Sequence, residues 1–235
     1  MINSYESEKL TEQIKALALK TGADLVGFTS AKKMEESAPK GHRPSVLIPN
    51  AKSIITIACG RQLNEDRDYF YEWGPHYSKT IIKLKDGIAP LRNEARKSVD
   101  QVKKILIENG FVAVTEMHGW SGILSFKMAG YLGGIGVIGK GSFLVNPKHG
   151  PLNILSCIVT DAPLEYGTPL TTDVCGDCIE CVKACKYGAF KSEGNSYKWI
   201  GERCRCYDLI MNPITLKWTY GPCNSACANA CPIGT

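Results

Sequence analysis

Hydrophobic residues recur at helical spacing in several stretches of the chain. In residues 5–22, Leu10, Ile14 and Leu17 are three or four positions apart, and Gly22 follows them. This pattern is typical of an amphipathic helix, and a glycine directly after the last apolar position is a frequent helix end. The same reasoning predicts two further helices, over 87–109 with Gly110 as its end and over 121–131.

Shorter apolar runs predict strands. Segment 152–161 is apolar over enough of its length to be central in a sheet, where both faces are covered. The other runs of this kind are 23–28, 53–59, 111–117 and 142–145. Because helices and strands alternate loosely along the chain, we expect an α/β (α+β) fold in which a mixed sheet carries helices packed on it.

The apolar pattern changes at segment 165–173, EYGTPLTTD, which has turn-forming residues and little periodicity. We place a domain boundary there, with one domain over 1–168 and a second over 169–235. The second domain has too few apolar residues for an independent core, so a cofactor is expected to supply the missing stability.

Composition and charge exclude some classes of protein. Hydrophobic residues make up 44% of the 235 residues and charged residues 22%, which is ordinary for a soluble globular protein. No apolar run approaches the roughly 20 residues that span a bilayer, and the first residues lack the features of a secretory signal. We therefore expect a cytoplasmic protein without a membrane partner. The net charge of +5 permits an acidic partner, such as RNA or an acidic redox protein, without indicating one.

Cysteine is the unusual component. The chain has 11 cysteines, and nine of them lie between Cys175 and Cys231. A disulfide scaffold would spread its cysteines through the fold and carry an export signal, whereas clustered thiols in a reducing cytosol indicate metal ligands. The remaining two, Cys59 and Cys157, lie in apolar runs and are expected to be core residues.

Two cysteine motifs predict two 4Fe–4S clusters. The first, C-x2-C-x2-C-x3-C, begins at Cys175, and the second, C-x3-C-x3-C-P, begins at Cys223. In two-cluster ferredoxins the fourth cysteine of such a run ligates the other cluster. By this rule the first cluster takes Cys175, Cys178, Cys181 and Cys231, and the second takes Cys185, Cys223, Cys227 and either Cys204 or Cys206.

Two departures from the bacterial ferredoxin pattern affect the second cluster most. Lys186 replaces the proline that usually follows the fourth cysteine, and the second motif has three intervening residues where two are common. Structural zinc is the alternative, since pairs of cysteines at C-x2-C spacing also form tetrahedral zinc sites.

Residues 130–141, GYLGGIGVIGKG, are rich in glycine. They contain the letters of a dinucleotide fingerprint and nearly those of a Walker A loop, but both motifs need a strand before and a helix after. Here a predicted helix precedes the segment, and a strand and a turn follow it. We therefore expect a turn in which the backbone lies close to something, and a large flat cofactor is the more specific interpretation.

Over nearly its whole length the chain resembles the cobalamin-dependent iron–sulfur reductases, which include epoxyqueuosine reductases and respiratory reductive dehalogenases. Besides the two cysteine motifs, the resemblance rests on residues 129–140, 144–150 and 160–165. Residues 203–207, Arg-Cys-Arg-Cys-Tyr, also resemble the Arg-Cys-x-x-Tyr element of these reductases. This similarity favours Cys204 over Cys206 as the ligand of the second cluster.

The resemblance implies a nitroreductase-like domain that binds cobalamin, followed by a ferredoxin-like domain. Electrons from an external donor of ferredoxin or flavodoxin type are then expected to pass through both clusters to the corrinoid, which reduces a substrate. The cofactor-binding residues implied are Gly134, Gly136, Ile138, Gly139, Lys140 and Ser142. The alternatives are a non-enzymatic carrier or corrinoid-handling accessory protein, and a reductase that binds flavin in place of cobalamin.

Two differences from epoxyqueuosine reductases bear on the substrate. The aspartate that donates a proton in those enzymes has no counterpart, because the matching position lies near Trp120. The sequence also ends four residues after Cys231, without their C-terminal helical repeats. Both differences make tRNA a doubtful partner, and we expect a small molecule or a modified nucleoside. Candidate proton donors are His118, Tyr77 and Tyr131; a lone histidine or tyrosine beside glycines is more often an ordinary hydrogen-bonding residue.

Overall fold

The fold is taken from a computed structural model, which describes most of the chain. The residues described are 3–38, 40–59, 70–71, 88–117, 123–152, 154–194, 196–204, 209–212, 217–220 and 226–234. The helices are α1 (Ser4–Lys20), α2 (Ala31–Ser37), α3 (Ile88–Glu108), α4 (Phe126–Leu132), α5 (Glu180–Lys183) and α6 (Ala226–Asn229), with 3-10 turns η1 (Pro44–Val46) and η2 (Gly201–Arg203).

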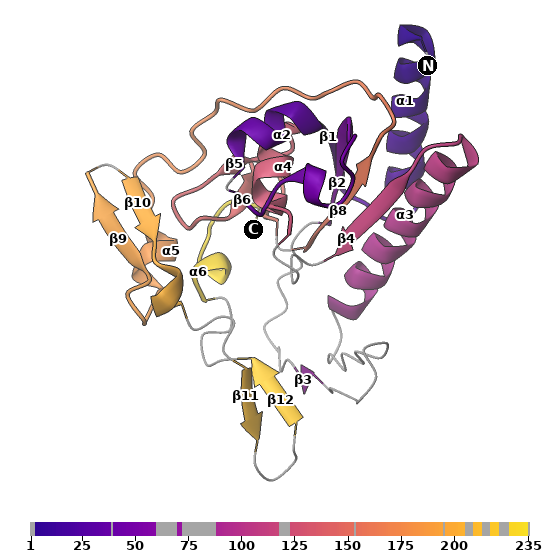
Figure 1. Cartoon of the computed structure of the whole chain (residues 1–235). Helices are drawn as coiled ribbons and strands as arrows, with labels where there is room; N and C mark the ends of the chain where they lie inside the picture. Colours follow the sequence, from indigo (N-terminus) through magenta and orange to yellow (C-terminus); the bar gives the residue numbers. More distant parts are fainter. Residues whose placement is uncertain are drawn as a thin grey trace.

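A four-stranded sheet forms the centre of the fold, in the order β1-β2-β8-β4 (Figure 1). Its strands are β1 (Leu25–Ser30), β2 (Ser53–Cys59), β8 (Ile154–Thr160) and β4 (Ala113–Met117). The prediction that 152–161 is central is confirmed, since β8 pairs with both β2 and β4. Every pairing in this sheet is antiparallel, where a mixed sheet was expected. Alternation of helices and strands does not fix strand direction, because long connections allow both parallel and antiparallel pairing.

Helices cover both faces of this sheet. On one face, α1 and α3 contact each other and pack over Ile55 and Ile57 of β2 and Ile158 of β8. On the other face, α2 and α4 pack over the alternate positions of the same strands, including Ile54 and Val159. All seven residues of β2 are buried, as expected for a strand between two helical layers.

The ends of the predicted helices agree closely with the structure, with one exception. A capping box between Asn3 and Glu6 begins α1, and Gly22 and Gly110 adopt positive φ directly after α1 and α3. The helix predicted over 121–131 begins only at Phe126, after the N-cap Ser125. Helix α2 was not predicted; its seven residues bury only Ala31 and Met34, too few to show a period.

Three smaller sheets complete the described fold. The first has the order β5-β6-β7, and the third has the order β11-β12-β3, so that residues 70–71 pair with a strand far along the chain. The second is the hairpin β9–β10, which Figure 1 shows beside α5 and α6. Their strands are β5 (Val137–Ile138), β6 (Leu144–Asn146), β7 (Gly150–Pro151), β9 (Phe190–Glu193), β10 (Ser196–Trp199), β11 (Leu209–Asn212), β12 (Lys217–Tyr220) and β3 (Phe70–Tyr71).

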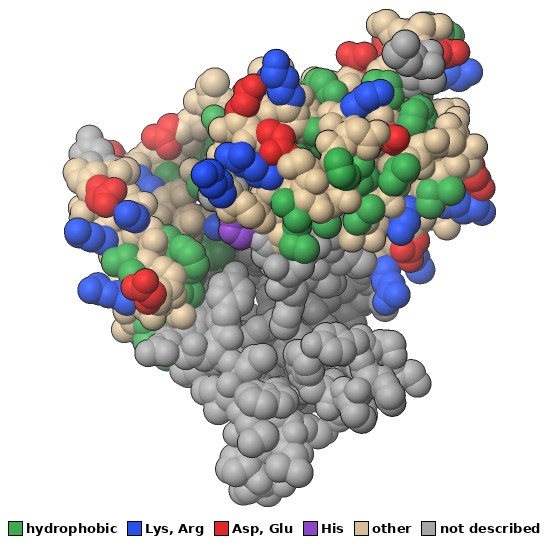
Figure 2. Space-filling view, viewed as in Figure 1, with side chains coloured by type: hydrophobic (Ala, Val, Ile, Leu, Met, Phe, Trp, Pro, Cys, Tyr) green, Lys and Arg blue, Asp and Glu red, His purple; other side chains and the backbone are tan. Residues whose placement is uncertain are grey.

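Charges of both signs are mixed on the face of the molecule that Figure 2 shows, where Lys and Arg side chains are interspersed with Asp and Glu. No helix in the described part of the chain combines the length and the apolar content needed to cross a membrane.

Candidate metal centre

The first cysteine motif folds into a loop that is organised by its own backbone. The Asp173 carboxylate accepts the N–H groups of Cys175 at 3.0 Å and Gly176 at 3.1 Å. Cys178 N–H then donates to the Cys175 carbonyl at 2.8 Å, and the single turn of α5 follows, which carries Cys181. Such tight turns place successive thiols on one side of a short loop.

Three cysteines from two distant segments, Cys175, Cys178 and Cys231, lie within electrostatic range of Cys181. Burial raises the pKa of the Cys181 thiol, and the charges of Cys175, Cys231 and Cys178 raise it further, so each of these three sulfurs is near enough to interact with that of Cys181. The Val182 N–H offsets part of this effect. These are the four cysteines that the sequence predicts as ligands of one cluster, including Cys231 from the second motif.

The chemistry of this group fits a polynuclear iron centre. Thiolates are the metal-binding form of cysteine, and several of them close together repel one another unless a cation is present. Among the described residues, no three Cys, His, Asp or Glu side chains converge on a position for a single metal ion. A cubane needs no such convergence, because each cysteine ligates a different iron.

The position of Cys231 depends on a close approach of two glycines. Residues Ile233 and Gly234, just after Cys231, lie against His149 and Gly150 at the turn between β6 and β7. Gly150 has φ +67 and Gly234 has φ +74, and a Cβ on Gly150 would lie 3.0 Å from the carbonyl carbon of Ile233. This contact anchors the end of the second motif to the body of the protein.

The glycine-rich segment ends against the cysteine loop. A Cβ on Gly139 would lie 3.2 Å from the Cys175 Sγ, and one on Gly141 would lie 3.2 Å from the Cys181 Sγ. The Lys140 N–H donates to the Cys175 Sγ at 3.5 Å, and its Nζ donates to the Gly176 carbonyl. Glycine at both positions lets the backbone lie close to the thiols, and a larger residue would push the neighbouring side chains aside.

The earlier glycines of the segment face protein backbone. The space beside Gly134 is filled by Thr168, and the space beside Gly136 is filled by Leu144 and Val145. The segment follows α4 and leads into short strands, so neither a dinucleotide fingerprint nor a Walker A loop has its required context. The expectation of a turn with close backbone contacts is confirmed.

The remaining predicted residues are placed as follows. Ile138 is 44% exposed. Tyr131 is half-buried and packs against the core on the α4 face of the sheet. Ser142 lies at the end of the glycine-rich turn with φ 59. His118, Tyr77 and Cys223 lie outside the described residues, as do Trp120 and Cys206.

Fewer described contacts define the second predicted cluster. Cys185 and Cys204 are half-buried, and Cys227 is buried in α6, which packs against α5. The Cys185 Sγ accepts the Ala189 N–H at 3.3 Å. Cys59 and Cys157 are buried in β2 and β8, as expected for core residues.

Sequence reasoning missed Lys127, near the start of α4. Its Nζ donates to the carbonyl of Ser142 at 2.7 Å and to the Ser142 hydroxyl at 3.2 Å. The same ammonium lies 5.7 Å from the centroid of the Trp199 ring, and burial lowers the pKa of Lys127. No local pattern marks this lysine, because its partners are distant in sequence.

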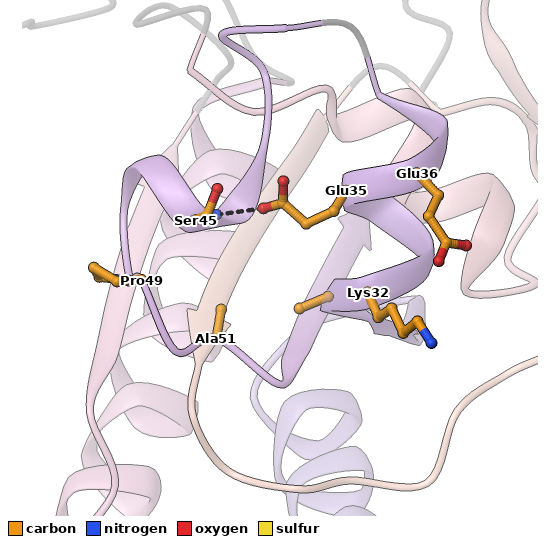
Figure 3. Close-up of a pocket in the computed structure, with 7 residues that line it drawn as sticks. Lys32, Glu35, Glu36, Ser45, Pro49 and Ala51 are labelled. Atoms are coloured by element: carbon orange, nitrogen blue, oxygen red, sulfur yellow. Dashed lines mark hydrogen bonds between the residues drawn. The ribbon is translucent and has the colours of Figure 1, made fainter.

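A surface pocket of about 300 Å³ lies between α2 and the loop that contains η1 (Figure 3). Its lining residues are Ala31, Lys32, Glu35, Glu36, Ser45, Pro49 and Ala51. The Glu35 carboxylate accepts the Ser45 N–H at 2.7 Å across it. The lining contains no cysteine and no residue that the sequence predicted, so this pocket is not part of the candidate centre.

Fold and site together define a class: a mixed α/β protein with antiparallel sheets, in which a glycine-rich turn contacts a group of four cysteines. More particularly, the chain is homologous to epoxyqueuosine reductases, at 24–27% identity over most of its length. The resemblance inferred from the sequence is therefore confirmed. No family model matches the sequence.

Two of these relatives indicate how much of the enzyme is covered. The epoxyqueuosine reductase of Staphylococcus aureus is 27% identical over 229 residues, which cover 83% of this chain and 56% of the relative. That of Leadbetterella byssophila is 26% identical over 94% of this chain and 79% of the relative. The chain thus spans little more than half of the first relative.

Solved structures show the same fold. An epoxyqueuosine reductase in complex with an epoxyqueuosine-modified tRNA-Tyr stem loop has a TM-score of 0.66 and 21% identity, over 99% of this chain and 66% of that chain. A reductive dehalogenase, whose structure suggests a mechanism for B12-dependent dehalogenation, has a TM-score of 0.54 and 18% identity, over 83% of this chain and 28% of that chain. Likenesses at these identities concern the fold alone.

Proposed function

We propose that this chain is an iron–sulfur oxidoreductase that resembles epoxyqueuosine reductase and passes electrons from two 4Fe–4S clusters to a bound corrinoid, which reduces a substrate. The observation that carries the proposal is that Cys231, from the second motif, lies near enough to Cys181 to interact with it electrostatically, as Cys175 and Cys178 of the first motif also do. In two-cluster ferredoxins, the first three cysteines of one motif and the last cysteine of the other ligate the same cluster. The homology to epoxyqueuosine reductases supports the same function.

Residues of the chain are assigned to the two clusters as their spacing suggests. The first cluster is held by Cys175, Cys178, Cys181 and Cys231, and the second by Cys185, Cys204, Cys223 and Cys227. When bound, the clusters supply one-electron transfer and the corrinoid supplies a reducible cobalt ion. We further propose a ferredoxin-like domain over 169–235 and a nitroreductase-like corrinoid domain over 1–168.

The protein's own contribution is to hold and tune the first cluster beside the glycine-rich turn. Lys140 N–H donates to the Cys175 Sγ, and hydrogen bonds to the ligand sulfurs raise the reduction potential of such clusters. Gly139 and Gly141 allow the backbone to approach Cys175 and Cys181 closely. This turn belongs to the segment proposed to line the corrinoid, with Ile138 as its exposed apolar residue.

The substrate proposed is a modified nucleoside or a small electrophilic molecule. The relative solved with an epoxyqueuosine-modified tRNA stem loop makes a tRNA-borne nucleoside the first to test, although charge on the face that Figure 2 shows is mixed rather than basic. Binding of such a stem loop at several salt concentrations decides this, because phosphate contacts weaken steeply with salt. Tyr131, Tyr77 and His118 are the proposed proton donors, and a ferredoxin or flavodoxin is the proposed electron donor.

The decisive experiment is anaerobic purification with cobalamin offered during reconstitution, followed by measurement of iron, sulfide, zinc and cobalt. We expect about eight irons per chain, with cobalt retained.

Cys231→Ala is expected to lose about half of the iron, because one of the two clusters loses a ligand. The matched control is Cys157→Ala, which removes a buried thiol of the sheet and is expected to keep all the iron. Zinc without iron, or equal iron in both variants, would contradict the cluster assignment, and iron without cobalt would contradict the corrinoid.

A further inference from the structure

Lys127 makes an unusual pair of contacts for a lysine at the start of a helix. Its ammonium donates both to the carbonyl and to the hydroxyl of Ser142, at 2.7 and 3.2 Å. Two hydrogen bonds from one ammonium to one residue restrain the backbone and the side chain of that residue together. The lysine therefore acts on the conformation of Ser142 rather than on its side chain alone.

Ser142 is the residue that needs such restraint. Among the described residues it is the one non-glycine with positive φ, at 59°. Residues with a Cβ adopt this left-handed conformation rarely, and they keep it only when their surroundings hold it. The Ser142 N–H donates to the Gly139 carbonyl at 2.9 Å, which closes the turn 139–142. Lys127 thus stabilises the strained end of that turn.

The turn in question contacts the thiols of the first cysteine motif. It holds the Lys140 N–H at 3.5 Å from the Cys175 Sγ and brings Gly141 against Cys181. A change in the turn would therefore lengthen an N–H···S contact to a proposed cluster ligand. Such contacts favour the reduced, more negative form of an iron–sulfur cluster.

The same ammonium also reaches the hairpin β9–β10. It lies 5.7 Å from the centroid of the Trp199 ring, within the range of a cation–π contact. The ring packs against Gly201, where a Cβ would lie 3.0 Å from it. The Gly201 carbonyl accepts the N–H of Cys204 at 3.0 Å. One lysine therefore connects the turn beside Cys175 with the hairpin that leads to Cys204.

We propose that Lys127 is a positioning residue that holds the turn 139–142 and the hairpin β9–β10 in place beside the cysteine loop, and thereby raises the reduction potential of the cluster that Cys175 ligates. The inference rests on the proposed function, because it concerns that cluster. It adds a role for a side chain that touches neither the cysteines nor a cofactor.

The test uses Lys127→Met, Lys127→Arg and, as a control for charge, Lys198→Met, which removes an exposed lysine from the same hairpin. An anaerobic redox titration followed by electron paramagnetic resonance gives the cluster potentials. Amide hydrogen exchange of 139–143 and 196–204 gives the local order. We expect Lys127→Met to shift one cluster to a more negative potential and to speed exchange in both segments. Lys127→Arg and Lys198→Met are expected to behave like the unchanged protein.

Several outcomes would overturn the inference. Unchanged potentials in Lys127→Met would do so, and so would an equal shift in Lys198→Met, because net charge would then explain the effect. If the unchanged protein binds no iron, the proposed function fails, and hydrogen exchange alone then supports or overturns the positioning role. If Lys127→Met does not fold, Ser142→Ala takes its place, since it removes only the hydroxyl acceptor and is expected to give a smaller shift in the same direction.

Discussion

The sheet body and the cysteine-rich segment are held together in different ways. In the body, residues 4–164, every residue of β2 is buried, and apolar side chains of α1, α3 and α4 pack against both faces of the sheet. In the cysteine-rich segment, residues 174–234, the buried apolar residues among those described are Ala189, Cys227 and Ala228. Burial of large apolar side chains is the main stabilising term in folding, so among the residues that the structure describes only the body shows an apolar core of its own.

The ion pair described in the cysteine-rich segment adds little stability. This pair, between Lys183 and Glu180 at 2.8 Å, joins two side chains that are each more than half exposed. Exposed pairs of this kind contribute about 0–1 kcal/mol. Under the proposed function, ligation of the cysteines would stabilise this segment in the way that packing stabilises the body, as in other small metal-binding domains.

Removal of iron is therefore expected to have the largest effect, and in one region only. Anaerobic chelation of the reconstituted protein should speed amide exchange throughout 174–204 and leave β2 and β8 protected. The reason is that the apo cysteine loop keeps only its turns and a few polar contacts, such as those of Asp173 and Lys140, whereas the sheet keeps its core. Hydrogen exchange with mass spectrometry measures both regions in one sample.

The two regions would not be independent if β8 lost its protection together with the loop. Equal protection of 174–204 with and without iron would also contradict the comparison, because the segment would then be stable without metal ligation. Chelation of the Cys231→Ala variant is the matched control. It is expected to show the loop already partly unprotected before the chelator is added.

Truncation of a core side chain is expected to lower the stability of the sheet without removing iron. Ile57 is fully buried in β2, below α1 and α3. Ile57→Ala should destabilise the protein by about 2–5 kcal/mol, because it removes buried methyl groups and leaves a cavity. Chemical denaturation measures the loss, and the iron content of the folded fraction should be unchanged. Iron loss that exceeded the fraction unfolded would show that the core directly shapes the metal centre.

The sequence predicted the body well because its signals are local. Apolar period and glycine stops marked α1 and α3, and the apolar run 53–59 coincides with β2. The spacing of the cysteines also predicted which of them share a cluster, because chemistry ties cysteine spacing to cubane geometry, and this assignment stays a prediction. The hairpin β9–β10 was missed because most of its residues are exposed and show no alternation. The role of Lys127 was missed because its partners, Ser142 and Trp199, are brought to it only by the fold.

The contact that anchors Cys231 to the body should be sensitive to a single methyl group. Gly150→Ala adds a Cβ at φ +67 in a position already filled by Ile233. We expect a loss of about 1–3 kcal/mol from backbone strain, and more from the clash. Because Cys231 precedes Ile233 by two residues, part of the iron of the first cluster should also be lost.

Gly194→Ala is the matched control for this variant. Gly194 has nearly the same conformation, φ +65, but nothing lies within 4 Å of its added Cβ. The Gly194→Ala variant should therefore be destabilised by backbone strain and keep its iron. If both variants kept all their iron, the tail after Cys231 would not be what positions that ligand. Thermal unfolding and iron analysis of the two proteins decide the matter.

The smallest expected effect lies inside the body, at two buried serines that differ in their hydrogen bonds. The Ser53 Oγ donates to the Ala162 carbonyl at 2.7 Å, whereas the Ser156 Oγ in β8 has no partner among the described residues. A buried polar group without a partner costs about 1–3 kcal/mol, so Ser156→Ala should stabilise the protein by about 1 kcal/mol. Ser53→Ala should destabilise it by a similar amount, because it leaves the carbonyl of Ala162 unpaired.

Urea denaturation curves of the two variants measure these opposite changes in the free energy of unfolding. Equal destabilisation by both would mean that Ser156 has a hydrogen-bond partner in solution. Either result concerns the core alone, since both serines lie in the sheet and neither change should alter the iron content.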